Sequence, residues 1–172
     1  MLPLQTKRLQ FQRYSKEDLP FIERLVTDPQ VMRYIGSGTA QDATYAKALL
    51  ERMLEQYENF DVFGLHKLVH RQTGKLIGHA GLVAQVIDDA FEIELGYWIT
   101  PDCWQQGLGT ETAQALKEYA IEELELERFI SVIQINNAAS IKIAENNGMQ
   151  LEKTIEHDGQ QVHVFVHLIE TN

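Results

Sequence analysis

Apolar and polar residues follow one another along the chain with two different periods, and these periods predict its strands and helices. Alternation at every second residue is typical of a half-buried strand, whereas apolar residues three and four positions apart are typical of a helix that packs on a core. Strands are predicted at 9–12, 62–69, 76–86, 91–99, 129–135, 151–156 and 161–169, and helices near 15–26, 29–35, 39–57, 110–124 and 137–147. This mixed order predicts the α+β class.

Short polar signals mark where several of these helices should begin. Ser15 and Asp18 stand three residues apart, and so do Thr39 and Asp42. At this spacing each side chain can hydrogen-bond the backbone of the other residue, so both pairs are interpreted as capping boxes. Asn137 precedes the helix at 137–147 and suits a helix start by its own capping chemistry.

The strand at 91–99 carries two chemically different faces. Gly96 within this run predicts a bulge or a close approach of another backbone. The strand at 129–135 is apolar almost throughout, and the helix between the two strands predicts a parallel pair joined by a crossover. The alternation places Ile93, Leu95, Tyr97 and Ile99 on one face and Glu92, Glu94, Gly96 and Trp98 on the other.

The C-terminal part of the chain has the pattern of a hairpin. Asp158-Gly159 between the last two strands predicts a tight turn. Neither a repeat nor a linker interrupts the sequence, so a single domain spanning 1–172 is expected. The alternation of the final strand predicts a packed side made of Val162, Val164, Val166 and Leu168.

A glycine-punctuated stretch at 104–112 leads from the strand at 91–99 into a helix. A helix N-terminus carries unpaired N–H groups and a partial positive charge, which makes such an entry suited to a phosphate. Gly107 and Gly109 lack Cβ and would let a ligand reach the backbone itself. Glycines also occur at turns for their positive φ alone, so the loop leaves both explanations open.

Composition narrows the possible partners. The chain has 15 Lys and Arg against 25 Asp and Glu, a net charge of −10, which argues against nucleic-acid and anionic-membrane partners. Cys103 is the single cysteine, so an internal disulfide is excluded and a reducing compartment is expected. No apolar run approaches the length of a membrane span and no signal-peptide pattern begins the sequence, so a cytoplasmic location is expected.

Seven separate stretches together resemble one family. They occur in the order seen in the GNAT acetyltransferases, and more closely in the ribosomal-protein N-acetyltransferase branch of RimJ/RimL type. The resemblance runs over nearly the whole chain. The stretches are Thr6–Leu9, Asp28–Tyr34, Gly78–Leu82, Glu94–Trp98, Trp104–Thr112, Asn137–Ser140 and Asn147–Met149.

This resemblance implies a fold and a donor site. It implies a central, mixed, mostly antiparallel seven-stranded sheet, flanked by helices, whose fourth and fifth strands splay apart to hold acetyl-CoA. The pantetheine arm would pair with the backbone of Tyr97, Trp98 and Ile99 as an extra strand does, and Asn137 would contact it. The loop residues implied to bind the donor, chiefly by gripping its diphosphate through backbone amides, are Gln105, Gln106, Gly107, Leu108, Gly109 and Thr110.

The implied reaction is transfer of the acetyl group to a primary amine by direct attack in a ternary complex. The amine must be neutral, so Glu94 is the first candidate for the base, with Glu92 and His79 in reserve. Ala144 stands where the superfamily often has a tyrosine acid, and Ser140 is the candidate proton donor to the leaving thiolate because similar proteins use a serine at this position. The acceptor is expected to be a protein N-terminus, an amino acid or a small amine, selected by the helices between Lys16 and Asn59 and by the loop before Phe91.

Other chemistries fit less well. Cys103 could carry an acetyl group, but the sequence supplies no positioned base for it. His163 and His167 share a strand face without a third ligand, so no metal site is expected. Thr112 stands in the place of the third glycine of a dinucleotide fingerprint. A catalytically silent module that binds acyl-CoA or docks a protein remains the alternative, and a homodimer is possible.

Overall fold

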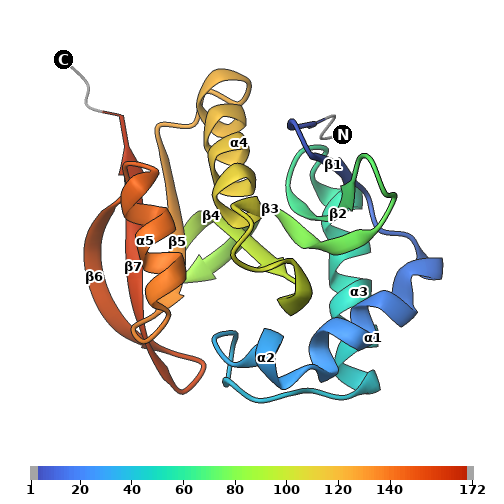
Figure 1. Ribbon diagram of the computed structural model, residues 1–172. Helices are drawn as coiled ribbons and strands as arrows, with labels where there is room; N and C mark the ends of the chain where they lie inside the picture. The colour runs from blue at the N-terminus through green and yellow to red at the C-terminus, as the bar shows by residue number, and fades with distance from the viewer. Residues whose placement is uncertain (1–3, 170–172) are drawn as a thin grey trace.

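The computed structural model describes residues 4–169, so the ends of the predicted 1–172 domain, 1–3 and 170–172, lie outside it. One seven-stranded sheet with strand order β1-β2-β3-β4-β5-β7-β6 runs through the molecule (Figure 1). Neighbouring strands are antiparallel except β4 and β5, which are parallel. The predicted mixed, mostly antiparallel sheet is confirmed.

The elements follow the predicted order with small shifts at their ends. The strands are β1 Leu9–Gln12, β2 Gly64–His70, β3 Leu76–Ile87, β4 Ala90–Ile99, β5 Arg128–Gln134, β6 Gln150–His157 and β7 Gln160–Leu168. The helices are α1 Leu19–Thr27, α2 Pro29–Met32, α3 Ala43–Asn59, α4 Leu108–Glu122 and α5 Ala138–Asn146, with short 3-10 turns at Lys16–Asp18 and Pro101–Cys103.

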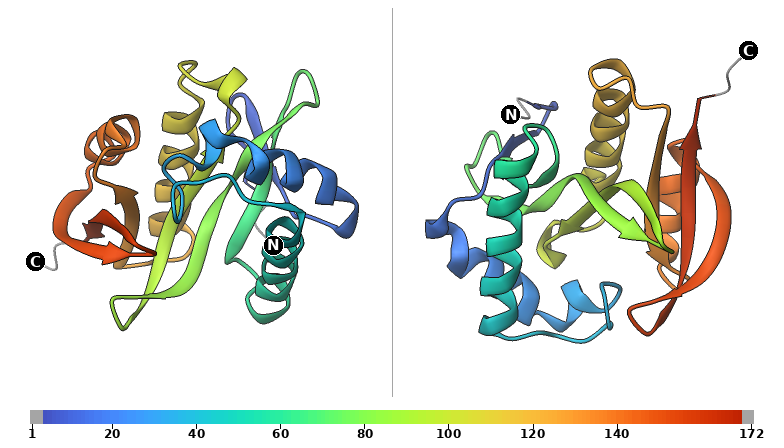
Figure 2. Two further views of the ribbon diagram at one scale, coloured as in Figure 1. Left: turned by 90° about the horizontal axis from the view of Figure 1, so that it is seen from below. Right: turned by 180° about the vertical axis from the view of Figure 1, so that it is seen from behind.

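Helices cover both faces of the sheet (Figure 2). Helices α4 and α5 pack with the apolar face of β4, where Ile93, Leu95 and Ile99 are buried. Helices α1, α2 and α3 form a second core, against which Trp98 packs from the opposite face of the same strand. The two predicted faces of β4 are therefore confirmed, and the strand separates two cores.

The prediction that Gly96 marks a bulge or a close backbone approach in β4 is wrong. The register continues without a shift through the Gly81–Gly96 pair, and a Cβ at Gly96 would meet no atom within 4 Å. Close backbone approach occurs instead on β3, where a Cβ at Gly78 would lie 1.9 Å from the Trp98 carbonyl oxygen. Gly96 faces open space, which becomes important for the site below.

The predicted capping boxes have different outcomes. At Ser15 and Asp18 both reciprocal bonds are present, and the backbone N–H of Ser15 donates to Asp18 Oδ2 at 2.8 Å. At the second pair Asp42 is itself the N-cap and accepts from the Tyr45 N–H at 2.9 Å, while Thr39 bonds to the Ser37 hydroxyl. Thr39 therefore does not cap α3. Asp42 caps it instead and satisfies the unpaired N–H groups of the first turn.

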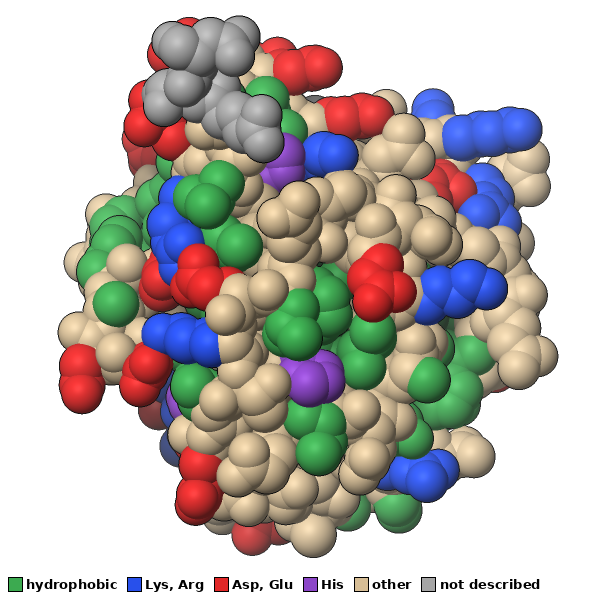
Figure 3. Space-filling view, turned by 90° about the vertical axis from the view of Figure 1, so that its left-hand side faces the viewer, with side chains coloured by type: hydrophobic (Ala, Val, Ile, Leu, Met, Phe, Trp, Pro, Cys, Tyr) green, Lys and Arg blue, Asp and Glu red, His purple; other side chains and the backbone are tan. Residues whose placement is uncertain are grey.

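The C-terminal hairpin is confirmed except at one residue. Asp158 and Gly159 both have positive φ, 51° and 76°, as a tight two-residue turn requires. Leu168, the last residue of β7, is 55% exposed. On the side of the molecule where β6 and β7 lie, hydrophobic, acidic and basic side chains are interspersed (Figure 3). Val162, Val164 and Val166 are buried as predicted.

Strands β4 and β5 pair at one position only, Glu94 opposite Ile130. Beyond it the Ser131 hydroxyl donates to the Leu95 carbonyl oxygen at 2.9 Å, in place of a backbone ladder. From Gly96 to Ile99 the edge of β4 that faces β5 has no paired strand within residues 4–169. The predicted splay between the fourth and fifth strands is therefore confirmed.

Candidate active site

A small cavity of about 100 Å³ lies in the gap between β4 and β5. Helix α5 closes its far side through Ser140 and Ala144. The gap brings together five of the residues that the sequence singled out for donor binding or catalysis, namely Glu94, Tyr97, Trp98, Asn137 and Ser140. Ile99 does not line this cavity, and its carbonyl oxygen accepts from Trp104 Nε1 at 2.8 Å.

A larger cavity of about 500 Å³ adjoins the first one. Its walls come from α3, from the start of β2, from the C-terminal end of β3 and from the β6–β7 turn. The segment between α2 and α3 closes it, held by Gln134 Nε2 on the Gly36 carbonyl oxygen and Gln160 Nε2 on the Ser37 carbonyl oxygen, both at 3.1 Å. Sequence reasoning placed acceptor binding in the helices between Lys16 and Asn59 and in the loop before Phe91; residues of α3 line this cavity, whereas that loop does not.

The two cavities share a wall. Gly96 stands in it without a side chain, so the cavities meet where β4 presents bare backbone. Glu94 lies two residues away on the same face of the strand, at the border between them. The residues that line both are Tyr34, Ile35, Glu94, Gly96, Trp98 and Val132.

The carboxyl group of Glu94 is unusually hard to ionise. Burial raises its pKa from 4.5 to about 7, against the opposing effect of a hydrogen bond to the backbone of Val132. The cause is desolvation, since a carboxylate surrounded by protein loses the water that stabilises its charge. A group with this pKa can both take up and release a proton near neutral pH.

The two reserve candidates for the base are engaged elsewhere. Glu92 accepts two bonds from Arg128, at 3.1 and 2.7 Å, and lines neither cavity. His79 is fully buried, and its Nδ1 lies 2.9 Å from the Tyr14 hydroxyl. Burial lowers the pKa of His79 to about 3, so its imidazole is neutral throughout the physiological range. Of the three carboxylate and imidazole candidates, Glu94 alone borders the cavities.

Asn137 and Ser140 form a pair at the start of α5. The Asn137 side chain caps the helix by accepting from the Ser140 N–H at 3.3 Å, and its Nδ2 donates to Ser140 Oγ at 3.1 Å. The capping interpretation of Asn137 is confirmed, and the same side chain also lines the gap between the strands. Asn137 therefore orients the Ser140 hydroxyl inside the gap.

The phenol of Tyr97 joins this pair, and sequence reasoning missed it. Burial raises the pKa of Tyr97, and a hydrogen bond with Ser140 lowers it by a smaller amount. Tyr97 had been assigned only through its backbone. The alternation of β4 predicts the face on which Tyr97 lies, but the contact of that face with α5 is set by the fold and not by the sequence pattern.

The glycine loop forms the entry to α4 as predicted, but the helix begins at Leu108 instead of Thr110. Gln105 and Gly107 have positive φ, 60° and 76°, and turn the chain into the helix. The first intrahelical bond runs from the Glu111 N–H to the Gly107 carbonyl oxygen at 3.0 Å. The N–H groups of the three preceding residues are therefore available to a ligand.

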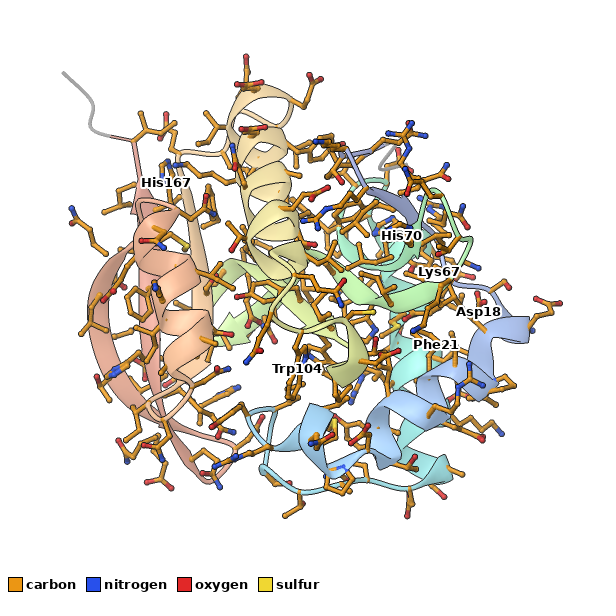
Figure 4. All side chains as sticks on the ribbon, viewed as in Figure 1. Asp18, Phe21, Lys67, His70, Trp104 and His167 are labelled. Atoms are coloured by element: carbon orange, nitrogen blue, oxygen red, sulfur yellow. The ribbon has the colours of Figure 1, made fainter. Side chains whose placement is uncertain are left out.

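The loop lies next to the gap between the strands. A Cβ at Gly109 would come within 3.2 Å of Ile143 and 3.6 Å of the Tyr97 ring, both of which line that gap. Gln105, Gln106 and Thr110 are exposed, and Leu108 is buried beneath them. Trp104 lies below the N-terminal end of α4 (Figure 4).

The residues behind the less favoured chemistries lie apart from the cavities. Cys103 is buried and lines neither of them. His163 Nδ1 bonds to the Thr154 hydroxyl at 2.7 Å, and His167, labelled on β7 in Figure 4, stacks on Phe129. Within residues 4–169 no group of three or more His, Cys, Asp or Glu could hold a metal. No helix in that range is long and apolar enough to cross a membrane.

A sheet that opens between two parallel strands, with a glycine loop and a helix N-terminus beside the opening, defines an acyltransferase fold of the GNAT type. The chain belongs to this family. The model of the acetyltransferase (GNAT) domain matches residues 8–150. The protein is an acyltransferase of that family, and the expected resemblance is confirmed.

Individual relatives agree with this assignment. The chain is 30% identical over 149 residues to the uncharacterised N-acetyltransferase YnaD of Bacillus subtilis, covering 86% of this chain and 82% of YnaD. An acetyltransferase of Agrobacterium tumefaciens superposes with a TM-score of 0.82 at 24% identity, over 97% and 94% of the two chains. RimL, a ribosomal L7/L12 alpha-N-protein acetyltransferase in complex with coenzyme A, superposes with a TM-score of 0.78 at 14% identity, over 98% of each chain. At such identities the two structures support the fold alone.

Proposed function

We propose that this protein transfers the acetyl group of acetyl-CoA to a primary amine by direct attack in a ternary complex. The observation that carries the proposal is the junction of two cavities at Gly96, with the half-buried Glu94 beside it. A donor in the β4–β5 gap and an acceptor in the larger cavity would meet at that point. Holding both reactants in one geometry removes much of the entropic barrier to their reaction.

The donor would be held mainly by backbone. The unpaired edge of β4 at Tyr97 and Trp98 is suited to the amide groups of a pantetheine arm, as in strand addition. The free N–H groups at the start of α4 are suited to the diphosphate. Asn137 offers a side-chain contact within the gap. Ile99 is a weaker candidate than its neighbours, because Trp104 already occupies one lone pair of its carbonyl oxygen.

Glu94 is proposed to remove the proton from the attacking amine, directly or through a water. Its pKa of about 7 allows the carboxylate to form at neutral pH and still hold a proton during the reaction. Its position on the border of both cavities supports this role, because the proposed point of attack is the junction of those cavities. Glu92 and His79 lack this access, which favours Glu94 among the three.

Ser140 is proposed to protonate the leaving thiolate. The leaving thiol has a pKa of about 8.5, so releasing it as an unprotonated thiolate at pH 7 costs only about 2 kcal/mol. A single hydroxyl oriented by Asn137 is therefore sufficient. Tyr97, which lines the same cavity as Ser140, is a second candidate donor that could pass a proton through it.

The acceptor is proposed to bind in the 500 Å³ cavity. Arg52 is the only Lys or Arg among its lining residues within the described chain, and the amide side chains of Gln56, Gln85 and Gln134 supply further polar contacts. RimL acts on a protein α-amine, which supports a protein N-terminus as one acceptor. An amino acid or a small amine is equally compatible with this lining.

The test is release of free thiol from acetyl-CoA across a panel of N-terminal peptides, amino acids and small amines. We expect acceptor-dependent thiol release that Glu94→Gln strongly lowers. Glu58→Gln is the matched control, because Glu58 is an exposed carboxylate on α3 outside both cavities. A thermal shift with CoA but no thiol release for any amine would refute the reaction and favour a silent binding module.

A further inference from the structure

A carboxylate stands in the first turn of α4, where the proposed function places a diphosphate. Glu111 accepts from the Thr6 hydroxyl at 2.5 Å, from the Arg8 N–H at 2.9 Å and from Arg8 Nε at 2.7 Å. Burial raises the pKa of Glu111, but these hydrogen bonds together lower it below its ordinary value. The side chain is therefore charged at neutral pH and would repel an anion at this helix end unless its charge is cancelled.

Arg8 contacts both this carboxylate and the loop. Its Nη1 donates to the Gln106 carbonyl oxygen at 2.8 Å, while its Nε holds Glu111. Its Nη2 would lie 3.4 Å from a Cβ at Gly107, and no hydrogen bond of Nη2 is found within the described chain. One guanidinium thus reaches from the N-terminal segment across the outside of the loop.

We propose that Arg8 is a donor-positioning residue, which cancels the charge of Glu111 and fixes the Gln106 peptide so that the loop can accept a diphosphate. The inference rests on the proposed function. Arg8 does not act on the reacting atoms, so it is expected to govern donor affinity and to leave turnover at saturating donor almost unchanged. The planar fork of arginine is required, because a lysine cannot contact a carboxylate and a carbonyl oxygen in this arrangement.

A purely structural role makes a different prediction. If Arg8 only ties the N-terminal segment to α4, its loss lowers stability and reduces the binding of every ligand of the gap by a similar factor. If it acts at the diphosphate, the loss affects CoA and spares pantetheine, which has the same arm without phosphate. Charge cancellation further predicts that removing the Glu111 charge compensates for the loss of Arg8.

The experiment measures CoA and pantetheine binding by calorimetry, together with the thermal midpoint of each variant. For Arg8→Ala we expect about 10- to 100-fold weaker CoA binding, unchanged pantetheine binding and kcat within about twofold. Adding Glu111→Gln to Arg8→Ala should recover the part of the CoA affinity that is lost through the uncancelled charge, but not the part that depends on the Gln106 contact. Lys7→Ala is the matched control, because it removes the same charge from the neighbouring exposed position and should change CoA binding less than twofold.

Equal losses for CoA and pantetheine, or CoA binding like that of the wild type, would overturn the inference. If Arg8→Ala does not fold, Glu111→Gln alone decides, since it leaves the Arg8 charge uncompensated and should tighten CoA binding severalfold. Unchanged or weaker binding in that variant overturns the inference. A wild-type protein that binds CoA but releases no thiol with any amine would refute the proposed function and leave the role of Arg8 in CoA binding standing.

Discussion

Replacing Glu94 by Gln should slow the reaction by an amount that depends on the acceptor. At pH 7, deprotonating a lysine side chain with a pKa of about 10.4 costs about 4.6 kcal/mol. Deprotonating an α-amine with a pKa of about 7.8 costs only about 1 kcal/mol. The two costs differ by about 3.5 kcal/mol. Loss of the base can therefore slow the reaction of a lysine-type acceptor at most roughly 400-fold more than that of an α-amine. We expect Glu94→Gln to lower turnover about 1000-fold with lysine-type acceptors and about 10-fold with α-amines.

The pH profile gives a second reading of the same variant. Because the pKa of Glu94 is raised to about 7, the carboxylate forms as the pH rises through 7, and turnover should rise with it. In the Glu94→Gln variant the rise of turnover near pH 7 should disappear, and only the rise caused by deprotonation of the amine acceptor should remain. The assay is initial-rate thiol release between pH 5.5 and 9 with one acceptor of each kind. Equal losses with both acceptors, or an unchanged limb near pH 7, would refute Glu94 as the base.

Four further substitutions test other parts of the site and the fold. Gly96→Val should fold normally, because a Cβ there meets no atom within 4 Å, yet lower turnover more than 100-fold by filling the junction of the cavities; full activity would disprove the junction. Ser140→Ala and Tyr97→Phe should each cost less than about 30-fold in kcat, since the thiolate needs only about 2 kcal/mol of help at pH 7; no further loss in their combination would support a shared proton path, and a larger loss would contradict it. In urea unfolding, Asp42→Ala should lower stability by about 1 kcal/mol, because Asp42 caps α3; no change would contradict that role.

The raised pKa of Glu94 also predicts a pH-dependent stability. The folded protein holds a proton that the unfolded chain has released once the pH exceeds about 4.5, so stability falls as the pH rises towards 7. Glu94→Gln removes this effect and should raise the free energy of unfolding by about 1–2 kcal/mol at pH 8, with little change at pH 4; the value allows for partial solvation through the cavities. Urea unfolding at the two pH values measures it, and equal effects at both would contradict the shift.

Local patterns predicted the elements of this protein well, because they depend on neighbours in sequence. The Asp158-Gly159 turn and the two faces of β4 follow from residue order alone. Thr39 failed as a cap because another residue nearby satisfies the same backbone groups, a competition that spacing does not resolve. Local patterns also located the glycine loop, while the family resemblance was needed to connect it with the strand gap.

The parts of the site that were missed depend on distant contacts. Gly96 looks like a bulge in sequence, and only the packing around β4 shows open space beside it. The Tyr97 phenol meets Ser140 because α5 lies over β4, and the Arg8–Glu111 pair joins residues 103 positions apart. No single-sequence pattern records such pairs, since their spacing is set by the fold.

The lone β4–β5 pairing at Glu94 and Ile130 divides the sheet into two half-sheets that meet at a single rung. A ligand that enters the gap and hydrogen-bonds to the free edge of β4 would take the place of a strand and connect the two half-sheets. Hydrogen exchange in β5, β6 and β7 should then slow when the gap is filled, so the resistance of the C-terminal half to opening is coupled to occupancy of the site.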